Sequence, residues 1–586
     1  MVDLKANPYF LTEEDCQWVT DTIENMTDEE KVGQLFFQLT ASMEEEYLKD
    51  LVDRYHIGGC RYNPAPGLEV QGQNRILQKY SKIPLFIACN TEHGGNGACS
   101  DGAYIGQGIK IGATNKEAYA FALGKMSNEQ AAAIGCNMAF APVSDILLNW
   151  QNTEVVTRAF GNEAKRVATM SSAYLKGAHT IDGFACAAKH FPGNGMDFRD
   201  AHVSNNVNDM DIIEWDNTFG YVYKTLIENG LDAIMGGHIM LPSYAKLLNP
   251  TLTDEEVMPA TLSPEIMTTL LRDKLGFNGM VVTDASHMVS MTNRMKRCQM
   301  LPAAINAGCD MFLFFNDPDE DYHTMLDAYK RGIISEERMT EALMRILGLK
   351  ARMGLHKKTL EELVPTPEAW EKVKDRPKHE EVREAISRDA ITLVKYKDKE
   401  VLPMTPERYK RIMIVYVKGA ELPMTQFMKM LGQDSGNPAQ ALKERLCEKG
   451  FEAFIYESPL EVMKKQMAEG EKPTLNLYFA GKNAIADFVK DMDLVITLCD
   501  VQGRPAFGMS KGGGEIPWYV YEIPVIVVGC DHPTMLADIP WARTYINTYD
   551  SKPETLDALV DHLMEGADAF SGIDPIDSFC GLVDAR

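Results

Sequence analysis

The run GMVVTDA at residues 279–285 decides the fold, because an almost wholly apolar stretch ends directly on a carboxylate. A strand buried on both faces is apolar along its whole length, and such strands are typical of parallel sheets. Seven similar runs accompany it, with helical patterns between them. The eight predicted strands are 32–39, 57–62, 84–90, 137–143, 184–190, 231–238, 279–285 and 309–315. Eight such units predict an α/β fold, a (β/α)8 TIM-like barrel, with an open doubly wound sheet as the alternative.

Amphipathic stretches in these intervals predict the helices of the barrel. The clearest are 115–133, 163–179, 212–229 and 264–274, and two further ones at 319–331 and 336–353 close the domain. A chain of 586 residues is too long for one hydrophobic core, so more than one domain is expected.

The composition changes after residue 355. The segment 356–384 is rich in Lys, Glu and Pro and is predicted to be a linker between the barrel at 1–355 and a C-terminal domain at 385–586. That domain has its own apolar runs at 390–396, 411–417, 451–456, 494–500, 524–530 and 543–549. Helical patterns between them predict a smaller α/β sandwich domain.

Charge and composition exclude several classes of function. A formal net charge of −25 does not favour a nucleic-acid partner, which needs clustered Lys and Arg. No apolar run is long enough to span a membrane, and the polar N-terminus does not have the pattern of a secretory signal. The 12 cysteines are scattered and form no CxxC pair. We therefore expect a cytoplasmic protein without a membrane partner.

Polar side chains stand where the predicted barrel strands end, and in this fold the carboxyl ends of the strands carry the chemistry. Asp284 is the sharpest case, because a carboxylate at the end of a buried strand is costly unless it is paired or used. The others are Asn90, Glu92, Arg158, Lys189, His190, Asp200, His202 and His238.

The stretch KHFPGNGMDFRDAH at 189–202 combines two kinds of chemistry. Lys189 and His190 together can hydrogen-bond the hydroxyls of a sugar. An aspartate near a histidine, as in Asp200 and His202, can orient the imidazole for proton transfer near neutral pH. The histidines lack the spacing of a known metal motif, so neither a metal nor another cofactor is predicted.

Seven motifs occur in the order typical of one family. They are APVSDI (141–146), TRAFGN (157–162), KHFPGNG (189–195) with DAH (200–202), GGHIMLP (236–242), LSPEIMTTLLRDKLGFNGMVVTDA (262–285), AINAGCDM (304–311) and RILGLKARMGL (345–355). The chain resembles glycoside hydrolase family 3, particularly its β-N-acetylglucosaminidase (β-N-acetylhexosaminidase) branch. The C-terminal domain is also similar to the family's α/β sandwich domain.

The resemblance implies a retaining glycoside hydrolase that releases terminal β-linked N-acetylhexosamine through a covalent glycosyl-enzyme intermediate. Asp284 matches the nucleophile, and His202, oriented by Asp200, matches the group that moves the proton. Lys189, His190 and Arg158 match residues that bind the sugar, and Asn90, Asn194 and His238 are further predicted substrate ligands. A small carbohydrate is the expected partner, and a homodimer is left open.

Three positions depart from the family pattern. Asn194 replaces a histidine, Asn90 an aspartate that contacts hydroxyls on the far side of the ring, and Ala98 an arginine. These changes leave open which sugar is bound, N-acetylgalactosamine included. Two alternatives to hydrolysis remain. A phosphorylase would use phosphate in the second step, because a neutral histidine does not repel it. A catalytically impaired sugar-binding protein is the other.

Overall fold

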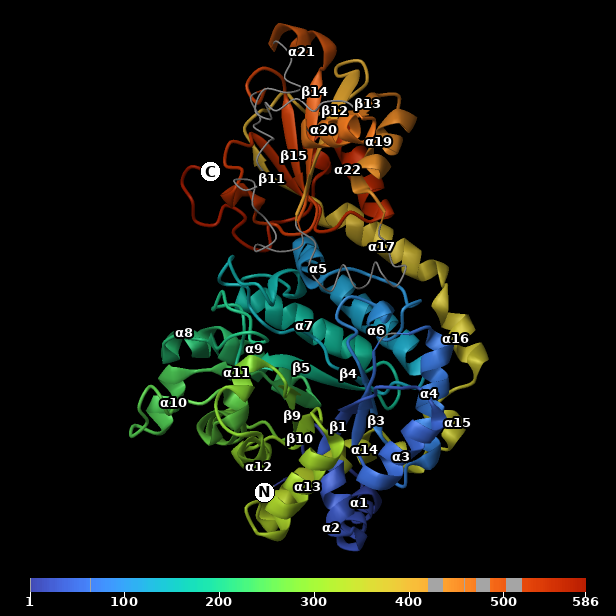
Figure 1. The fold of residues 1–586 in the computed structure, drawn as a ribbon, viewed down its shortest axis with the longest axis vertical. Helices are drawn as coiled ribbons and strands as arrows, with labels where there is room; N and C mark the ends of the chain where they lie inside the picture. The colour runs from blue at the N-terminus through green and yellow to red at the C-terminus, as the bar shows by residue number, and fades with distance from the viewer. Residues whose placement is uncertain (1, 64, 420–435, 458, 471–484, 502–518) are drawn as a thin grey trace. The chain divides into compact units, whose positions relative to one another are not determined.

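The structure is a computed structural model that describes residues 2–63, 65–419, 436–457, 459–470, 485–501 and 519–586 (Figure 1). It divides into two compact units. The first comprises Met1–Gly108 and Lys116–Val382, and the second comprises Ile109–Asn115 and Arg383–Arg586. Among the described residues, no helix is long and apolar enough to cross a membrane.

The first unit is a closed barrel of parallel strands in the order β1-β10-β9-β7-β5-β4-β3-β2. The strands are β1 (Phe36–Leu39), β2 (Gly59–Arg61), β3 (Phe86–Cys89), β4 (Met138–Ala139), β5 (Ala185–Phe191), β7 (Ala233–Gly236), β9 (Met280–Ala285) and β10 (Met311–Leu313). Each lies inside or overlaps one predicted run. The predicted (β/α)8 barrel is thus confirmed, and the open sheet is wrong.

Helices surround the barrel strands (Figure 1). They are α3 (Glu45–Tyr55), α4 (Gly67–Tyr80), α6 (Glu117–Ala133), α7 (Ala164–Ala178), α8 (Ile212–Asn217), α9 (Phe219–Glu228), the π-helix η4 (Glu265–Lys274), α12 (Arg297–Ala307), α13 (Pro318–Lys330) and α14 (Glu336–Arg352). The loops hold α10 (Pro242–Leu248), α11 (Val289–Thr292), η2 (Val156–Arg158) and the paired strands β6 (Asn206–Val207) and β8 (Ile239–Met240). Large side chains fill the barrel interior, for example Phe37, whose ring centroid lies 5.4 Å from that of Phe140.

Two stretches differ from the prediction. Residues 32–34 belong to helix α2 (Asp28–Gln34), which follows α1 (Glu13–Asn25), because Thr27 and Glu30 form a capping box that starts a helix. The expected linker 356–384 is mostly helical, in η5 (Leu355–Lys357), α15 (Leu360–Leu363), α16 (Pro367–Lys374) and the start of α17 (Pro377–Ala390). Trp370 is fully buried there, with its ring close to Gly67 of α4, so one aromatic side chain anchors a segment without an extended apolar face.

The second unit contains a sheet in the order β11-β16-β15-β14-β12-β13, in which β11 is antiparallel and the other pairs are parallel. The strands are β11 (Thr392–Tyr396), β12 (Arg411–Lys418), β13 (Glu452–Ile455), β14 (Leu494–Asp500), β15 (Val525–Gly529) and β16 (Thr544–Asn547). The six predicted runs all contain a strand. The predicted smaller α/β domain is confirmed.

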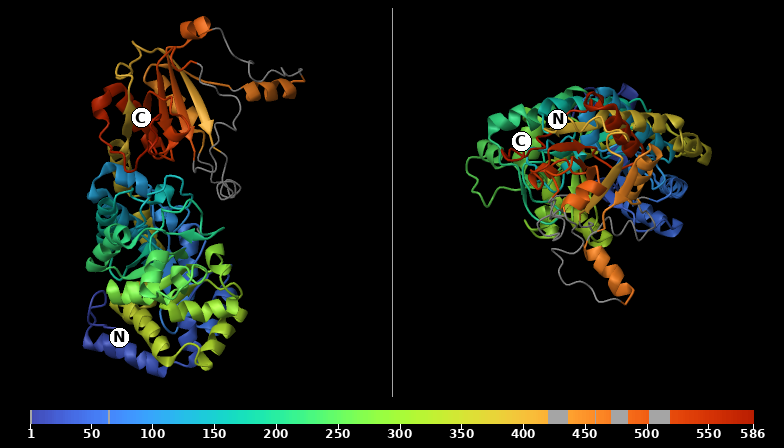
Figure 2. Two further views of the ribbon diagram at one scale, coloured as in Figure 1. Left: turned by 90° about the vertical axis from the view of Figure 1, so that its left-hand side faces the viewer. Right: turned by 90° about the horizontal axis from the view of Figure 1, so that it is seen from above.

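Both faces of this sheet are covered by apolar packing. One cluster joins the sheet to α19 (Pro438–Glu448) and α22 (Pro553–Glu565), and α22 appears in red beside the sheet in Figure 2. The other cluster contains side chains of α21 (Ile485–Asp491) and η7 (Met535–Ala537). Helix α20 (Pro459–Ala468) also belongs to this unit.

The short helix α5 (Gly108–Thr114) lies almost entirely within the second unit, although the chain on either side of it belongs to the barrel. The Lys110 ammonium is buried and donates to the carboxylate of Asp550 at 2.8 Å, to Thr555 Oγ1 at 2.7 Å and to Ser387 Oγ at 2.9 Å. A buried ammonium is tolerated only with such partners, so these contacts fix the segment in the second unit.

Candidate active site

Two predicted cationic residues meet at one carboxylate at the rim of the barrel. Glu92, in the loop after β3, accepts from Lys189 Nζ at 2.6 Å. It also receives a bidentate pair from Arg158 of η2, with Nε at 2.8 Å and Nη2 at 3.0 Å. Because all three side chains are largely buried, the two cations are held in fixed positions at the end of β5. Sequence reasoning placed Glu92 at this rim but did not include it among the site residues.

The charges in this group are strongly coupled. Burial opposes ionisation of Glu92, but Arg158 and Lys189 outweigh it and hold the pKa of this carboxyl well below its usual range. Burial lowers the pKa of Lys189, and Glu92 opposes this shift only in part. The triad therefore offers N–H donors on two cations whose charge one carboxylate neutralises in part.

A second carboxylate fixes the orientation of His190. Asp145 is buried and accepts from His190 Nδ1 at 2.6 Å and from the backbone N–H of His190 at 3.1 Å. The bond to Asp145 assigns the proton to Nδ1, so Nε2 faces Asp284 and Arg158, 4.0 Å from Asp284 Oδ2 and 3.4 Å from Arg158 Nη2. Asp145 belongs to the APVSDI motif, and that was the only sequence signal that could have indicated it.

Asp284 lies at the end of β9 with its side chain 16% exposed. One oxygen, Oδ1, accepts the backbone N–H of Ala285 at 2.7 Å, and Oδ2 faces His190. Burial favours the neutral acid, but His190, His238 and the bond from Ala285 together lower the pKa of Asp284. At neutral pH this carboxylate is ionised, as a nucleophile must be.

His238 is fully buried behind Asp284. Its Nε2 donates to the carbonyl oxygen of Ala285 at 3.1 Å, and its Nδ1 accepts from Thr261 Oγ1 at 2.7 Å. Burial lowers the pKa of His238. Since both ring nitrogens are used inside the protein, these contacts favour a role in orienting the end of β9, and its predicted role as a sugar ligand stays a prediction.

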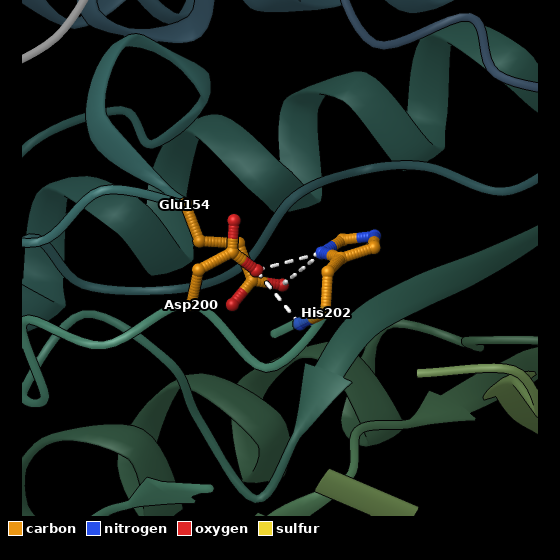
Figure 3. A group of neighbouring side chains, drawn as sticks. All are labelled: Glu154, Asp200 and His202. Carbon is orange, nitrogen blue, oxygen red and sulfur yellow. Dashed lines mark hydrogen bonds and ion pairs between the residues drawn. The ribbon is translucent and has the colours of Figure 1, made fainter. Parts of the chain in front are cut away.

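The loop after β5 carries Asp200 and His202 as a hydrogen-bonded pair (Figure 3). Asp200 Oδ1 accepts from His202 Nδ1 at 2.7 Å and from the His202 backbone N–H at 2.8 Å. The bond to Asp200 raises the pKa of His202, against burial. The His202 side chain is 50% exposed, so Nε2 is open for proton transfer.

The residues that depart from the family pattern lie at the same end of the barrel. Asn90 directly follows β3 and is half-buried. Asn194 is buried, donates its backbone N–H to Asp145 Oδ1 at 2.8 Å, and donates its side-chain amide to Glu154 Oε2 at 2.9 Å. Ala98 is buried. Asn194 therefore supports the loop, and its predicted sugar contact stays a prediction.

Glu154 is a further residue that sequence reasoning missed. Its Oε1 lies 3.9 Å from His202 Nδ1, on the same side as Asp200 (Figure 3). In the described part of the chain, the ligand atoms of Glu154, Asp200 and His202 lie within 4.8 Å of one another, close enough to hold a metal ion. Their existing hydrogen bonds account for this grouping without one. The weak signal was its position, four residues before Arg158.

Comparisons with known proteins identify the family of the chain. The model described as "Glycosyl hydrolase family 3 N terminal domain" matches residues 27–349. A beta-N-acetylglucosaminidase/beta-glucosidase of Cellulomonas fimi is 35% identical over 592 residues, which cover 100% of both chains. The solved structure of the beta-glucoside phosphorylase BglX is 33% identical with a TM-score of 0.87, covering 100% of this chain and 99% of that one. A family 3 beta-N-acetylglucosaminidase from Paenibacillus sp. shares the fold at 22% identity, with a TM-score of 0.73 over 95% of this chain and 100% of that one.

Proposed function

The chain belongs to glycosyl hydrolase family 3, and on that premise we propose that it removes terminal β-linked N-acetylglucosamine-type sugars by double displacement at Asp284. One observation carries the proposal. An ionised carboxylate at the end of β9 lies at the rim that also holds the His190–Arg158–Lys189 donors and the aspartate-paired His202. The small carbohydrate substrate would be bound mainly by these donors.

In the first step, Asp284 Oδ2 attacks the anomeric carbon and forms a covalent ester as the bond to the glycosidic oxygen breaks. The His202 imidazolium gives its proton to that oxygen, so the aglycone leaves as an alcohol. In the second step, the neutral His202 takes a proton from water while the water oxygen attacks the anomeric carbon and releases Asp284. Asp200 holds the imidazole by Nδ1 through both steps, which leaves Nε2 for the transfer.

Asn90 bears on the identity of the sugar. The neutral amide stands where a carboxylate is typical of the family, so the hydroxyls on that side of the ring would be recognised by a weaker, uncharged partner. We therefore propose a relaxed specificity that includes β-glucosides. The name of the Cellulomonas fimi relative covers both activities and supports this.

Phosphorolysis is the second candidate, and a specific observation favours it. A full-length structural relative at 33% identity is named a beta-glucoside phosphorylase. After the first step His202 is neutral, and a neutral base does not repel an incoming phosphate dianion as a carboxylate would. The phosphate oxygen would then replace water, and the product would be a sugar 1-phosphate.

One experiment tests these proposals together. Nitrophenyl β-N-acetylglucosaminide and nitrophenyl β-glucoside are incubated with the enzyme, with and without millimolar phosphate, and the released sugars are identified. Free sugar in both cases supports hydrolysis, whereas sugar 1-phosphate formed only with phosphate supports phosphorolysis. Absence of turnover on either glycoside and on a wider aryl glycoside panel would support the non-catalytic sugar-binding alternative and contradict both enzymatic proposals.

A further inference from the structure

A strip of three residues before η2 contacts the loop that carries His202. Asn152 Nδ2 donates to the carbonyl oxygen of Asp197 at 2.6 Å, and Thr153 Oγ1 donates to that of Phe198 at 3.0 Å. Glu154 Oε2 accepts the backbone N–H of Ala201 at 3.2 Å. The side chains of residues 152, 153 and 154 thus bond to successive backbone groups of the loop. We call this set of three hydrogen bonds the seam.

The strip itself is held rigidly. Asn152 Oδ1 accepts the backbone N–H groups of Glu154 at 3.0 Å and of Val155 at 2.7 Å. Arg158 Nη1 donates to the carbonyl oxygen of Glu154 at 3.3 Å. Because Arg158 is bound to Glu92, the strip connects the His202 loop to the fixed cations at the end of β5.

Glu154 ends this seam next to the imidazole. Its side chain is only 4% exposed, and its carboxylate receives hydrogen bonds from Asn194 Nδ2 and the Ala201 backbone. His202 Nδ1 lies 3.9 Å from Oε1. Glu154 also interacts electrostatically with Arg158, and the His202 imidazolium is a second cation in place beside this buried carboxylate.

We propose that Glu154 is a positioning residue for catalysis, which holds the Asp200–His202 loop in its working place and favours the protonated imidazole needed for leaving-group departure. This rests on the proposed role of His202 as the acid. Asp200 selects the tautomer, whereas Glu154 sets where the loop lies relative to Arg158. Glu154 lies in the loop after β4, whereas Asp284 lies on β9. A substitution of Glu154 is therefore expected to alter proton transfer by His202 and not nucleophilic attack by Asp284.

Other groups also face His202. Asp200, Glu154 and Asp284 favour its charged form, while His238 and His287 act against it from the side of β9. On that side Ser290 N–H donates to Ala201 O at 3.1 Å and Val289 N–H to His202 O at 3.2 Å, and the Asn293 side chain donates to Asn205 Oδ1 at 2.7 Å. Asp200 and Glu154 are thus the two carboxylates that lie beside Nδ1 of the imidazole in Figure 3, with Asp200 the closer one.

The test compares two aglycones in the full-length enzyme. Dinitrophenyl glycosides leave without a proton, whereas alkyl glycosides need the acid. Glu154→Gln is expected to lower kcat/KM for an alkyl glycoside by about tenfold or more while changing the dinitrophenyl rate by less than about threefold. The basic limb of the kcat/KM profile should move to lower pH, because the imidazolium loses a negative neighbour. The matched control is Glu163→Gln, which changes an exposed carboxylate that pairs with Arg166 at 3.1 Å.

A second variant separates charge from geometry. Glu154→Asp keeps the charge but shortens the reach to Ala201, so it should show the same preference for the dinitrophenyl substrate with little movement of the pH limb. The ratio of the two rates does not depend on how much of the preparation is folded. Equal losses on both substrates, no loss on either, or failure of both variants to fold would each overturn the proposal, because Glu154 would then have a structural role alone.

The proposed function fails differently. If His202→Ala keeps the ratio of alkyl to dinitrophenyl rates, then His202 is not the acid and the premise is wrong. If His202→Ala changes that ratio and Glu154→Gln does not, the premise stands and only the role of Glu154 is rejected.

Discussion

Buried charges gather at both ends of the barrel, and the two groups are built differently. At the base, Asp310 precedes β10 and accepts from Arg272 Nη2 at 2.8 Å, Arg338 Nη2 at 2.8 Å and Arg345 Nη1 at 3.3 Å. At the rim, Glu92 accepts from Arg158 and Lys189. Both carboxylates are almost wholly buried, and each is held ionised by its cations although burial opposes this.

The difference lies in what each group leaves open. The base arginines come from η4 and α14 and tie these helices to the start of β10, and the partly exposed Glu341 beside them serves the same ion-pair network through Arg338 and Arg345. At the rim, Asp284 and the half-exposed His202 stand beside the paired cations. Burial of a charge alone therefore does not identify an active site. The useful sign is a partly exposed reactive group supported by a buried network of paired charges.

The largest expected effect is a loss of turnover when the carboxylate at the rim, Asp284, is removed. Asp284→Asn removes the nucleophile and should lower kcat by about a thousandfold or more, while the free energy of unfolding changes by less than about 1 kcal/mol. Steady-state rates on a nitrophenyl glycoside and urea unfolding measure the two quantities. A variant with near-normal turnover would mean that another group forms the covalent bond.

The base should respond in the opposite way. Asp310→Asn leaves three arginines around a neutral side chain and should cost about 3–5 kcal/mol of unfolding free energy, with normal kcat in the folded fraction. Asp327→Asn is the matched control, because its pair with Arg331 is exposed and is worth less than about 1 kcal/mol. If Asp310→Asn kept its stability but lost activity, the base would have a functional role.

Removing the negative charge of Glu92 should weaken sugar binding without changing how strongly the reaction depends on proton donation by His202. Glu92→Gln leaves Lys189 and Arg158 uncompensated and is expected to lower kcat/KM by about tenfold to a hundredfold, equivalent to about 1–3 kcal/mol. Measured on alkyl and dinitrophenyl glycosides, the loss should be similar for both. A loss confined to the alkyl glycoside would place Glu92 in proton transfer.

A smaller effect concerns pH. Asp200 raises the pKa of His202, so Asp200→Asn should move the basic limb of kcat/KM to lower pH. The same pairing stabilises the folded state below the ordinary pKa of an imidazole, and this stabilisation is lost as the pH rises through the raised pKa. Rate and unfolding profiles recorded over the same pH range test both statements. An unmoved limb would show that another group sets it.

The smallest expected effect is that of a chelator. Because Glu154, Asp200 and His202 already bond to one another and to their neighbours, treatment with EDTA should leave kcat unchanged. Loss of activity that a divalent cation restores would show that this trio binds a metal ion.

The sequence was a good guide to the fold and to one half of the site. Apolar runs such as GMVVTDA predicted the strands correctly because burial on both faces leaves a local signal. Motif positions predicted Lys189, His190 and Asp284 at the carboxyl ends of strands, where the structure places them. The partners Asp145 and Glu154 were missed, since they are paired only after β4, β5 and their loops come together. Trp370 likewise makes the expected linker a packed helical segment through a contact that is distant in sequence.

Helix α5 has a consequence for how the chain is made. Residues 109–115 leave the ribosome early, but Ser387, Asp550 and Thr555, which surround Lys110, are among the residues synthesised later. Until then, Ile109 and Ile111 have no core to enter, while the barrel around this interruption can begin to form. Expression of 1–382 alone would leave this apolar segment permanently exposed, so we expect such a fragment to aggregate or to engage chaperones, and dissection of the two units requires removal of 109–115 as well.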